Sequence, residues 1–161
     1  MSAAGREPRT GAPRPGDPLA TLRLAPWSEA APLVMPLRLR VFVDEQGVPP
    51  EMEQDEFDAV SVHAIATDAA GEVIGTARLL PDGHVGRFAV AAPQRGSGVG
   101  ERLLRALLEA AARRGHRRVV LHAQLTAEAF YAHYGFERTG EVFMEAGIAH
   151  ATMARTLEPP G

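Results

Sequence analysis

The feature that most constrains this chain is a strand, a glycine-rich turn and a helix that follow one another between Arg87 and Leu104. An apolar run ends at Val90, glycines stand at positions 96, 98 and 100, and leucines then recur at helical spacing. The first N–H groups of a helix have no internal acceptor and carry partial positive charge, and glycines let an anion approach the backbone. The turn over 94–100 therefore predicts a site for a phosphate or pyrophosphate group.

Two familiar nucleotide-binding motifs do not match this turn. A dinucleotide-binding fingerprint needs G-x-G-x-x-G and an acidic residue about 20 positions later. Here the third glycine comes one residue early, and the stretch 117–122 offers no acid. A nucleotide-triphosphate loop needs a lysine, and all 17 Lys or Arg positions of this chain are arginines. A dinucleotide-dependent oxidoreductase and a triphosphate site are therefore disfavoured, and a tight strand-to-helix connection without a ligand stays open.

Length and composition predict one ordinary domain. The chain has 161 residues, of which 45% are hydrophobic and 23% charged, and domains commonly hold about 100–200 residues. Residues 1–18 are rich in Pro, Gly, Arg and Ala and predict a disordered tail. We expect the domain itself over 19–157 and a loose C-terminal end over 158–161.

Charge, hydropathy and residue usage disfavour several kinds of partner and chemistry. A formal net charge of -3 provides no basic field for nucleic acid. No apolar run approaches the ~18–20 residues that cross a bilayer, and the N-terminus lacks the apolar core of a signal peptide, so we expect a cytoplasmic protein. Without cysteine there is no disulfide, thiolate nucleophile or Cys-based zinc site. No histidine pair has the spacing of metal ligands on a helix, so no metal is expected.

Periodicity and turn residues predict the remaining elements. A helix capped by Ser28 is expected to run toward Val43, with a buried face formed by Leu33, Leu37 and Val41. Further helices are expected at 98–114 and 126–134. Strands are expected at 19–24, 62–67, 72–80, 84–90, 119–122, 136–143 and 148–157. Turn residues at 68–71, 81–83 and 145–147 link neighbouring strands as hairpins, which favours a mostly antiparallel sheet.

The glycine turn resembles the acetyl-coenzyme A motif of the GNAT acetyltransferase superfamily, R/Q-x-x-G-x-G/A, which Arg95, Gly98 and Gly100 match. The resemblance implies an α+β fold, an α/β/α sandwich with a mixed, mostly antiparallel sheet of about six to seven strands. It also implies that the strand backbone contacts the pantetheine arm and that the loop amides bind the pyrophosphate. The implied cofactor-binding residues are Phe88, Ala89, Val90, Arg95, Gly96, Ser97, Gly98, Val99 and Gly100.

A second segment, Ala127–Phe136, resembles another signature of that family, an alanine followed by aromatic-Tyr and then Gly-Phe. The resemblance places Tyr131 where many members keep a tyrosine that donates a proton to the departing coenzyme A thiolate. Reference pKa values near 10 for Tyr and about 8.5 for a thiol make it a modest acid. We expect Phe130 and Tyr134 to pack the short helix against the sheet. Gln124 stands where many relatives have an asparagine, which puts a side-chain contact to pantetheine in doubt.

On the acceptor side the resemblance narrows to an ElaA-like subgroup. It is carried by 39–43 with Glu45-Gln46, by Glu53-x-Asp55-x-x-Asp58, and by His63, Gly86-Arg87 and Ile148-x-His150-x-x-Met153. GNAT folds border the acceptor pocket with the first helix and the loop after it, where this chain has its acidic cluster. Carboxylates there could attract an ammonium group and take its proton, with Glu45 as catalytic base or anchor and Glu53, Asp55 and His150 as acceptor-binding residues.

A solvated acidic loop remains an equal alternative for the cluster as a whole. Arg78 and Arg87 lie on neighbouring expected strands. They could recognise a carboxylate or the cofactor, or could pair with the acidic loop, and the sequence does not decide between these.

The function that the resemblance implies is N-acetyl transfer from acetyl-coenzyme A to a primary amine, by direct attack in a ternary complex. A backbone N–H near Val90 would stabilise the oxyanion, and Tyr131 would assist the leaving thiolate. The acceptor would be a small-molecule or peptide amine, with neither nucleic acid nor membrane as a partner. Homodimers are common in the family and stay open here. The alternative is a non-catalytic acyl-coenzyme A-binding sensor or scaffold.

Overall fold

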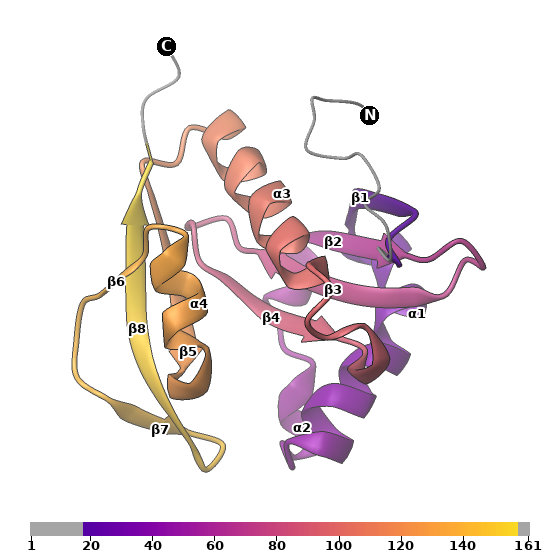
Figure 1. Cartoon of the computed structure of the whole chain (residues 1–161), viewed down its shortest axis with the longest axis horizontal. Coiled ribbons are helices and arrows are strands. Elements are labelled where there is room, and N and C mark those ends of the chain that lie inside the picture. The colour runs from indigo at the N-terminus through magenta and orange to yellow at the C-terminus, as the bar shows by residue number, and fades with distance from the viewer. Residues whose placement is uncertain (1–17, 158–161) are drawn as a thin grey trace.

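Two antiparallel sheets carry the fold of residues 18–157, the part of the chain that the computed structural model describes (Figure 1). The first sheet has the order β1-β2-β3-β4. Its strands are β1 (Thr21–Pro26), β2 (Val62–Thr67), β3 (Val73–Leu79) and β4 (Val85–Val90). The second has the order β5-β8-β6, and β7 pairs with the other end of β8. Its strands are β5 (Arg118–Gln124), β6 (Glu137–Arg138), β7 (Phe143–Glu145) and β8 (Ile148–Thr156).

Within the described residues the backbones of the two sheets pair at one point only. His84, just before β4, forms an isolated parallel bridge with Val120 of β5, and the Val120 N–H donates to the carbonyl of Gly83 at 3.1 Å. Beyond this bridge no ladder joins β4 to β5 among residues 18–157, and the two strands diverge in Figure 1. The separation leaves one edge of β4 without a neighbouring strand, and this edge becomes part of the candidate site.

Helices cover both faces of the first sheet. On one face α1 (Trp27–Arg38) continues into the π-helix η1 (Leu39–Glu45), which leads to α2 (Pro50–Glu53) and the 3-10 turn η2 (Asp58–Val60). On the other face lies α3 (Val99–Arg113), which follows the 3-10 turn η3 (Ala92–Gln94). The short helix α4 (Glu128–His133), preceded by η4 (Leu125–Ala127), lies beside the second sheet (Figure 1).

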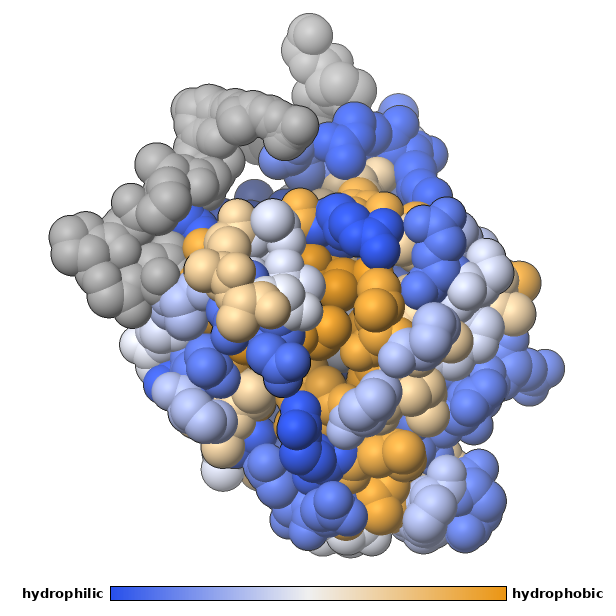
Figure 2. All heavy atoms as spheres, turned by 90° about the vertical axis from the view of Figure 1, so that its right-hand side faces the viewer, coloured by the Kyte–Doolittle hydropathy of each residue, from blue (hydrophilic) through white to orange (hydrophobic). Residues whose placement is uncertain are grey.

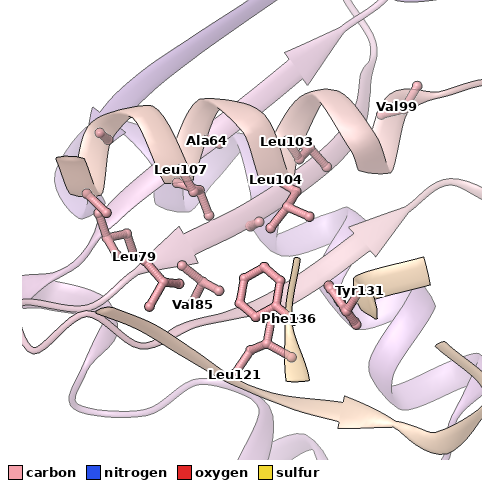
Figure 3. Close-up of a cluster of buried hydrophobic side chains, with 14 of the residues drawn as sticks. Ala64, Leu79, Val85, Val99, Leu103, Leu104, Leu107, Leu121, Tyr131 and Phe136 are labelled. Carbon is pink, nitrogen blue, oxygen red and sulfur yellow. The ribbon is translucent and has the colours of Figure 1, made fainter. Parts of the chain in front are cut away.

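The main core lies under α3 and joins the two sheets. Side chains alternate along β2, so that Ala64 packs on the α3 side and Ile65 on the α1 side. Because both faces of β2 are covered, this strand is a nearly continuous apolar run in the sequence. Figure 3 shows the leucines of α3 above the strands, with Leu121 of β5 and Phe136, the residue before β6, pointing toward them. This shared core holds the second sheet against the first although the sheets hardly pair.

The expected fold class and most of the expected elements are confirmed. Three details were wrong. Ser28 does not cap α1, because the helix already begins at Trp27. The N-cap residue is Pro26, whose side chain has no donor or acceptor. Leu33 is 40% exposed, whereas Leu37 and Val41 are buried as expected. The strand expected over 136–143 is interrupted at 139–142 and becomes β6 and β7. The N-terminal and C-terminal tails expected at 1–18 and 158–161 fall almost entirely outside the described residues.

The surface shows an apolar strip on one face. Figure 2 shows this strip running down the middle of the face, with hydrophilic side chains on both sides. Folded monomers commonly expose patches of this kind. Within 18–157 no helix has the length and apolar character needed to cross a membrane.

Candidate active site

The glycine turn forms an open helix N-terminus, as the sequence predicts. Gly96 and Gly98 have left-handed backbones, with φ of 84° and 95°, a region that side-chain-bearing residues rarely adopt. Gly98 is the N-cap of α3, and no side chain caps the helix. The Ser97 hydroxyl donates to the Gln94 carbonyl and so braces the turn itself. The first N–H groups of a 15-residue helix therefore remain available to an anion.

The free edge of β4 lies next to this turn. The Ala91 N–H donates to the Ile74 carbonyl of β3 at 2.9 Å. Backbone groups alternate between the two edges of an antiparallel strand, so the N–H and C=O of Val90 point away from β3. The Val90 carbonyl accepts a hydrogen bond from Nε of Arg95 at 2.9 Å, which leaves the Val90 N–H facing the space between the sheets.

A bulge in β4 precedes this edge. Thr76 pairs with Ala89 and Arg78 with Gly86, so Arg87 and Phe88 together oppose the single residue Ala77. Arg87 has a left-handed backbone, with φ of 53°. Bulges of this kind bend a strand and change the direction of the backbone groups that follow. The bulge thus accompanies the divergence of β4 from β5.

A pocket of ≈ 340 Å³ collects most of the predicted cofactor residues. Those that line it are Val90, Arg95, Gly96, Gly98, Val99 and Gly100, joined by Gln94, Glu101, Phe130 and Tyr134. The sequence predicted only a packing role for the last two. Phe130 lies on α4 and Tyr134 is its C-cap residue. Their rings lie 5.1 Å apart, and Phe130 is 37% exposed. Tyr134 is only partly buried. Two aromatic residues four positions apart in the segment that follows the leucine-rich helix were the only sequence signal for this wall of the pocket.

Tyr131 lies deeper than its two aromatic neighbours. Its side chain is buried in the main core, with edge-on ring contacts to Phe88 at 5.9 Å and Phe136 at 6.0 Å. Burial raises the pKa of Tyr131 well above its usual value. The hydroxyl therefore stays protonated at neutral pH, which suits a hydrogen-bond donor better than a group that gives up its proton fully.

Two consecutive residues at the end of η1 connect the two sides of the site. The Glu45 carboxylate pairs with the Arg95 guanidinium at 2.7 Å, and both side chains are partly exposed. The Gln46 amide oxygen accepts a hydrogen bond from Gln124 of β5 at 3.1 Å. Glu45 thus lies against the glycine turn, and Gln124 is directed toward η1.

The acidic segment after η1 forms a buried network with arginines. Arg38 pairs with Glu53 and binds Asp58 through two hydrogen bonds of 2.9 and 3.1 Å. Arg78 binds Asp55 in the same two-pronged way at 2.6 and 2.9 Å and also reaches Asp58 at 2.8 Å. The sequence left open whether the arginines pair with this loop, and in the structure they do.

Burial and charge act in opposite directions on the carboxylates of this network. Burial by itself would raise the pKa of Asp55 and of Asp58, but hydrogen bonds and charge from the arginines outweigh it and lower both pKa values. Glu53, Asp58 and Arg38 are almost completely buried. Asp55 is partly exposed, with 28% of its side chain accessible. That Glu53 and Asp55 bind the acceptor remains a prediction, and both are already bound by arginines.

Two histidines of the predicted pattern are buried. His63 donates from Nε2 to the Asp58 carbonyl at 2.9 Å, and its ring centre lies 4.8 Å from that of Trp27. Burial lowers the pKa of His63 below its ordinary value. His150 donates from Nδ1 to the Ile148 carbonyl at 2.7 Å, and its register partner on β5 is Gln124. Its role toward an acceptor also remains a prediction.

Metal ligands do not gather anywhere in the described part of the chain. Within 18–157 no three His, Asp or Glu side chains converge in a way that could hold a metal ion.

Comparison with known proteins agrees with this geometry. The family model of the acetyltransferase (GNAT) domain matches residues 28–157. The chain is 36% identical over 122 residues to the uncharacterized N-acetyltransferase YjcF of Bacillus subtilis, covering 74% of this chain and 87% of that one. An acyl-CoA N-acyltransferase from Pseudomonas aeruginosa has a TM-score of 0.76 at 30% identity, over 86% of this chain and 99% of that one. Escherichia coli ElaA has a TM-score of 0.77 at 29% identity, over 84% and 99%. The chain therefore belongs to the GNAT acetyltransferase family.

Proposed function

We propose that this chain transfers an acetyl group from acetyl-coenzyme A to a primary amine. The observation that carries the proposal is the pocket in which the open N-terminus of α3 and the unpaired edge of β4 lie side by side. The first can bind a pyrophosphate, and the second can bind a chain of amides and a carbonyl. Membership in an acetyltransferase family and the name of the Pseudomonas relative, an acyl-CoA N-acyltransferase, support the choice of donor.

The turn fits a pyrophosphate through its backbone. A Cβ at Gly96 would meet no atom within 4 Å, so the turn is open on that side. A Cβ at Gly100 would lie 3.9 Å from Phe130 and Val90, which places the helix start in contact range of both other walls of the pocket. Arg95 contributes the positive charge, while its Nε ties the turn to β4.

The reaction we propose is direct transfer without an acyl-enzyme. The amine nitrogen attacks the thioester carbonyl carbon, and the Val90 N–H donates to the oxygen as it gains charge. The carbon–sulfur bond then breaks and the nitrogen keeps the acetyl group. The Tyr131 hydroxyl donates a hydrogen bond to the departing sulfur, which takes up a proton as the amine loses one.

Glu45 is the candidate acceptor for the amine proton. Its carboxylate pairs with Arg95, which lines the pocket, whereas Glu53 is buried on Arg38. Glu45 can accept a proton directly or through one water while it keeps its contact with Arg95. We propose Asp55 and His150 as secondary contacts of the acceptor.

Two measurements test the proposal. Isothermal titration with acetyl-coenzyme A should show binding, and thiol release should then appear with at least one amine of a library. Tyr131→Phe should lower kcat at least about tenfold, because a positioned donor contributes that much or more, and should leave the affinity for acetyl-coenzyme A unchanged. Binding without turnover on any amine would favour the sensor. Absence of binding would defeat the proposal.

A further inference from the structure

Arg87, in the β4 bulge, has a strained left-handed backbone. It is one of two non-glycine residues with positive φ in the described chain. A residue in this region persists where its surroundings hold it there. Hydrogen bonds of the Arg87 side chain to the segment 52–55 hold its backbone in this conformation. Nε donates to the Glu53 carbonyl at 3.1 Å, and Nη2 donates to Oδ2 of Asp55 at 3.1 Å and to the Met52 carbonyl at 3.4 Å.

The loop that holds Arg87 is itself anchored deep in the protein. Asp55 is bound at both carboxylate oxygens by Arg78 of β3. Arg78 also reaches Asp58, which Arg38 of α1 holds through two hydrogen bonds. Positive and negative groups therefore alternate from α1 through β3 to the bulge. Two-pronged arginine–carboxylate pairs fix geometry as well as charge, so this chain of pairs is a rigid support.

The bulge positions the unpaired edge of β4, which carries the Val90 N–H. Immediately after Arg87, the ring of Phe88 contacts Tyr131, and two residues later the Val90 N–H faces the space between the sheets. A register slip of one residue reverses the two edges and the two faces of a strand. If β4 lost its bulge, the Val90 N–H would turn toward β3 and Phe88 would leave Tyr131.

We propose that Arg87, held by Asp55, is a positioning residue for the transfer reaction. It keeps the bulge in register and thereby directs the Val90 N–H and the Phe88–Tyr131 contact at the thioester. This inference rests on the proposed function for its catalytic part, while its structural part stands without it. The acidic residues of the Glu53-x-Asp55-x-x-Asp58 pattern, together with Arg78 and Arg87, then share one role, which is to hold the β4 bulge in register.

The test compares Arg87→Ala with Arg87→Lys and with Arg113→Ala as a matched control. Arg113 makes an exposed pair with Glu109 on α3, at 2.8 Å. In Arg87→Ala we expect kcat to fall about tenfold or more, since small displacements of a reacting group can cost about a hundredfold. The KM for acetyl-coenzyme A should stay within about threefold, because the glycine turn is untouched. Arg87→Lys keeps the charge, loses the fork and should recover only part of kcat. Arg113→Ala should match the parent protein.

A second readout needs no turnover. Amide hydrogen exchange or the amide NMR signals of Phe88 and Val90 should change in Arg87→Ala without ligand and remain unchanged in Arg113→Ala. Unchanged amides would overturn the inference whatever the kinetics. So would a rise in the KM of the amine with kcat intact, which would make Arg87 a substrate contact. Changed amides in a protein that never binds acetyl-coenzyme A would support the structural role and count against the proposed function alone.

Discussion

The glycine turn and the buried arginine–carboxylate network both contact β4, and they are built by opposite means. The turn uses backbone amides from one continuous stretch, Gln94–Glu101, and leaves its wall open. The network uses side chains from α1, the following loop, β3 and β4, and closes most of them off from water. Backbone amides bind with little dependence on side-chain identity, whereas a buried charge depends entirely on its partner. The two halves should therefore respond very differently to substitution.

The largest effect should come from breaking the network at its most buried cation. Arg38→Met leaves Glu53 and Asp58 without their principal partner, and loss of one member of a buried pair costs about 3–5 kcal/mol. We expect the free energy of unfolding in urea to fall by that amount. As the control, Arg23→Met removes a pair whose side chains are 51% and 61% exposed and should cost less than about 1 kcal/mol. Equal losses in the two variants would show that the network does not stabilise the fold.

An intermediate effect should come from the turn. Gly98 has φ of 95°, so Gly98→Ala strains the start of α3 by about 1–2 kcal/mol. The same change displaces the amides that we propose for the pyrophosphate, so the affinity for acetyl-coenzyme A should fall about tenfold, as measured by titration. Gly140→Ala is the control, since a Cβ there meets nothing within 4 Å and φ is not in the left-handed region. Unchanged affinity in Gly98→Ala would separate the turn from cofactor binding.

The smallest effect is a pH dependence confined to the network. The folded pKa of His63 lies below its ordinary 6.5, so the unfolded chain takes up a proton at higher pH than the folded one. The stability that neutral His63 contributes is present above about pH 6.5 and is lost as pH falls toward the folded pKa. Asp55 and Asp58, whose pKa values are lowered from 3.8, lose their contribution only at lower pH, below that value.

Urea unfolding between pH 7.5 and 5 measures the loss of the stability that neutral His63 contributes. His63→Gln should flatten this part of the stability profile, while the exposed His133→Gln should leave it as in the parent protein. A profile that keeps its slope in His63→Gln would assign the loss to another group.

The glycine-turn half of the candidate site was largely predictable from the sequence because its parts are local. A strand, three alternating glycines and a leucine-rich helix are contiguous, and their order alone places amides around an anion. Phe130 and Tyr134 were missed as pocket residues, because a short aromatic helix is equally typical of core packing until its orientation is known. The break in the strand expected at 136–143 was missed because propensity says little about where a long pairing segment is interrupted.

The acidic half of the candidate site was not predictable in the same way. The sequence shows seven acidic residues between positions 44 and 58, but not which of them meet an arginine. Glu45 and Glu53 differ little in their local sequence, yet the first reaches Arg95 at the pocket wall and the second is buried on Arg38. The bulge at Arg87, which accompanies the divergence of β4 from β5, is likewise predicted by no local pattern.

By itself the sequence determined the fold class, the glycine turn and the membership of a family, since periodicity and motif spacing are properties of neighbouring residues. Tertiary structure alone decided which charges are paired, which edge of β4 faces the space between the sheets, and which aromatic rings line the pocket. Ion pairs and strand edges are contacts between distant segments, and their energies depend on burial and detailed geometry that arise only when those segments pack together.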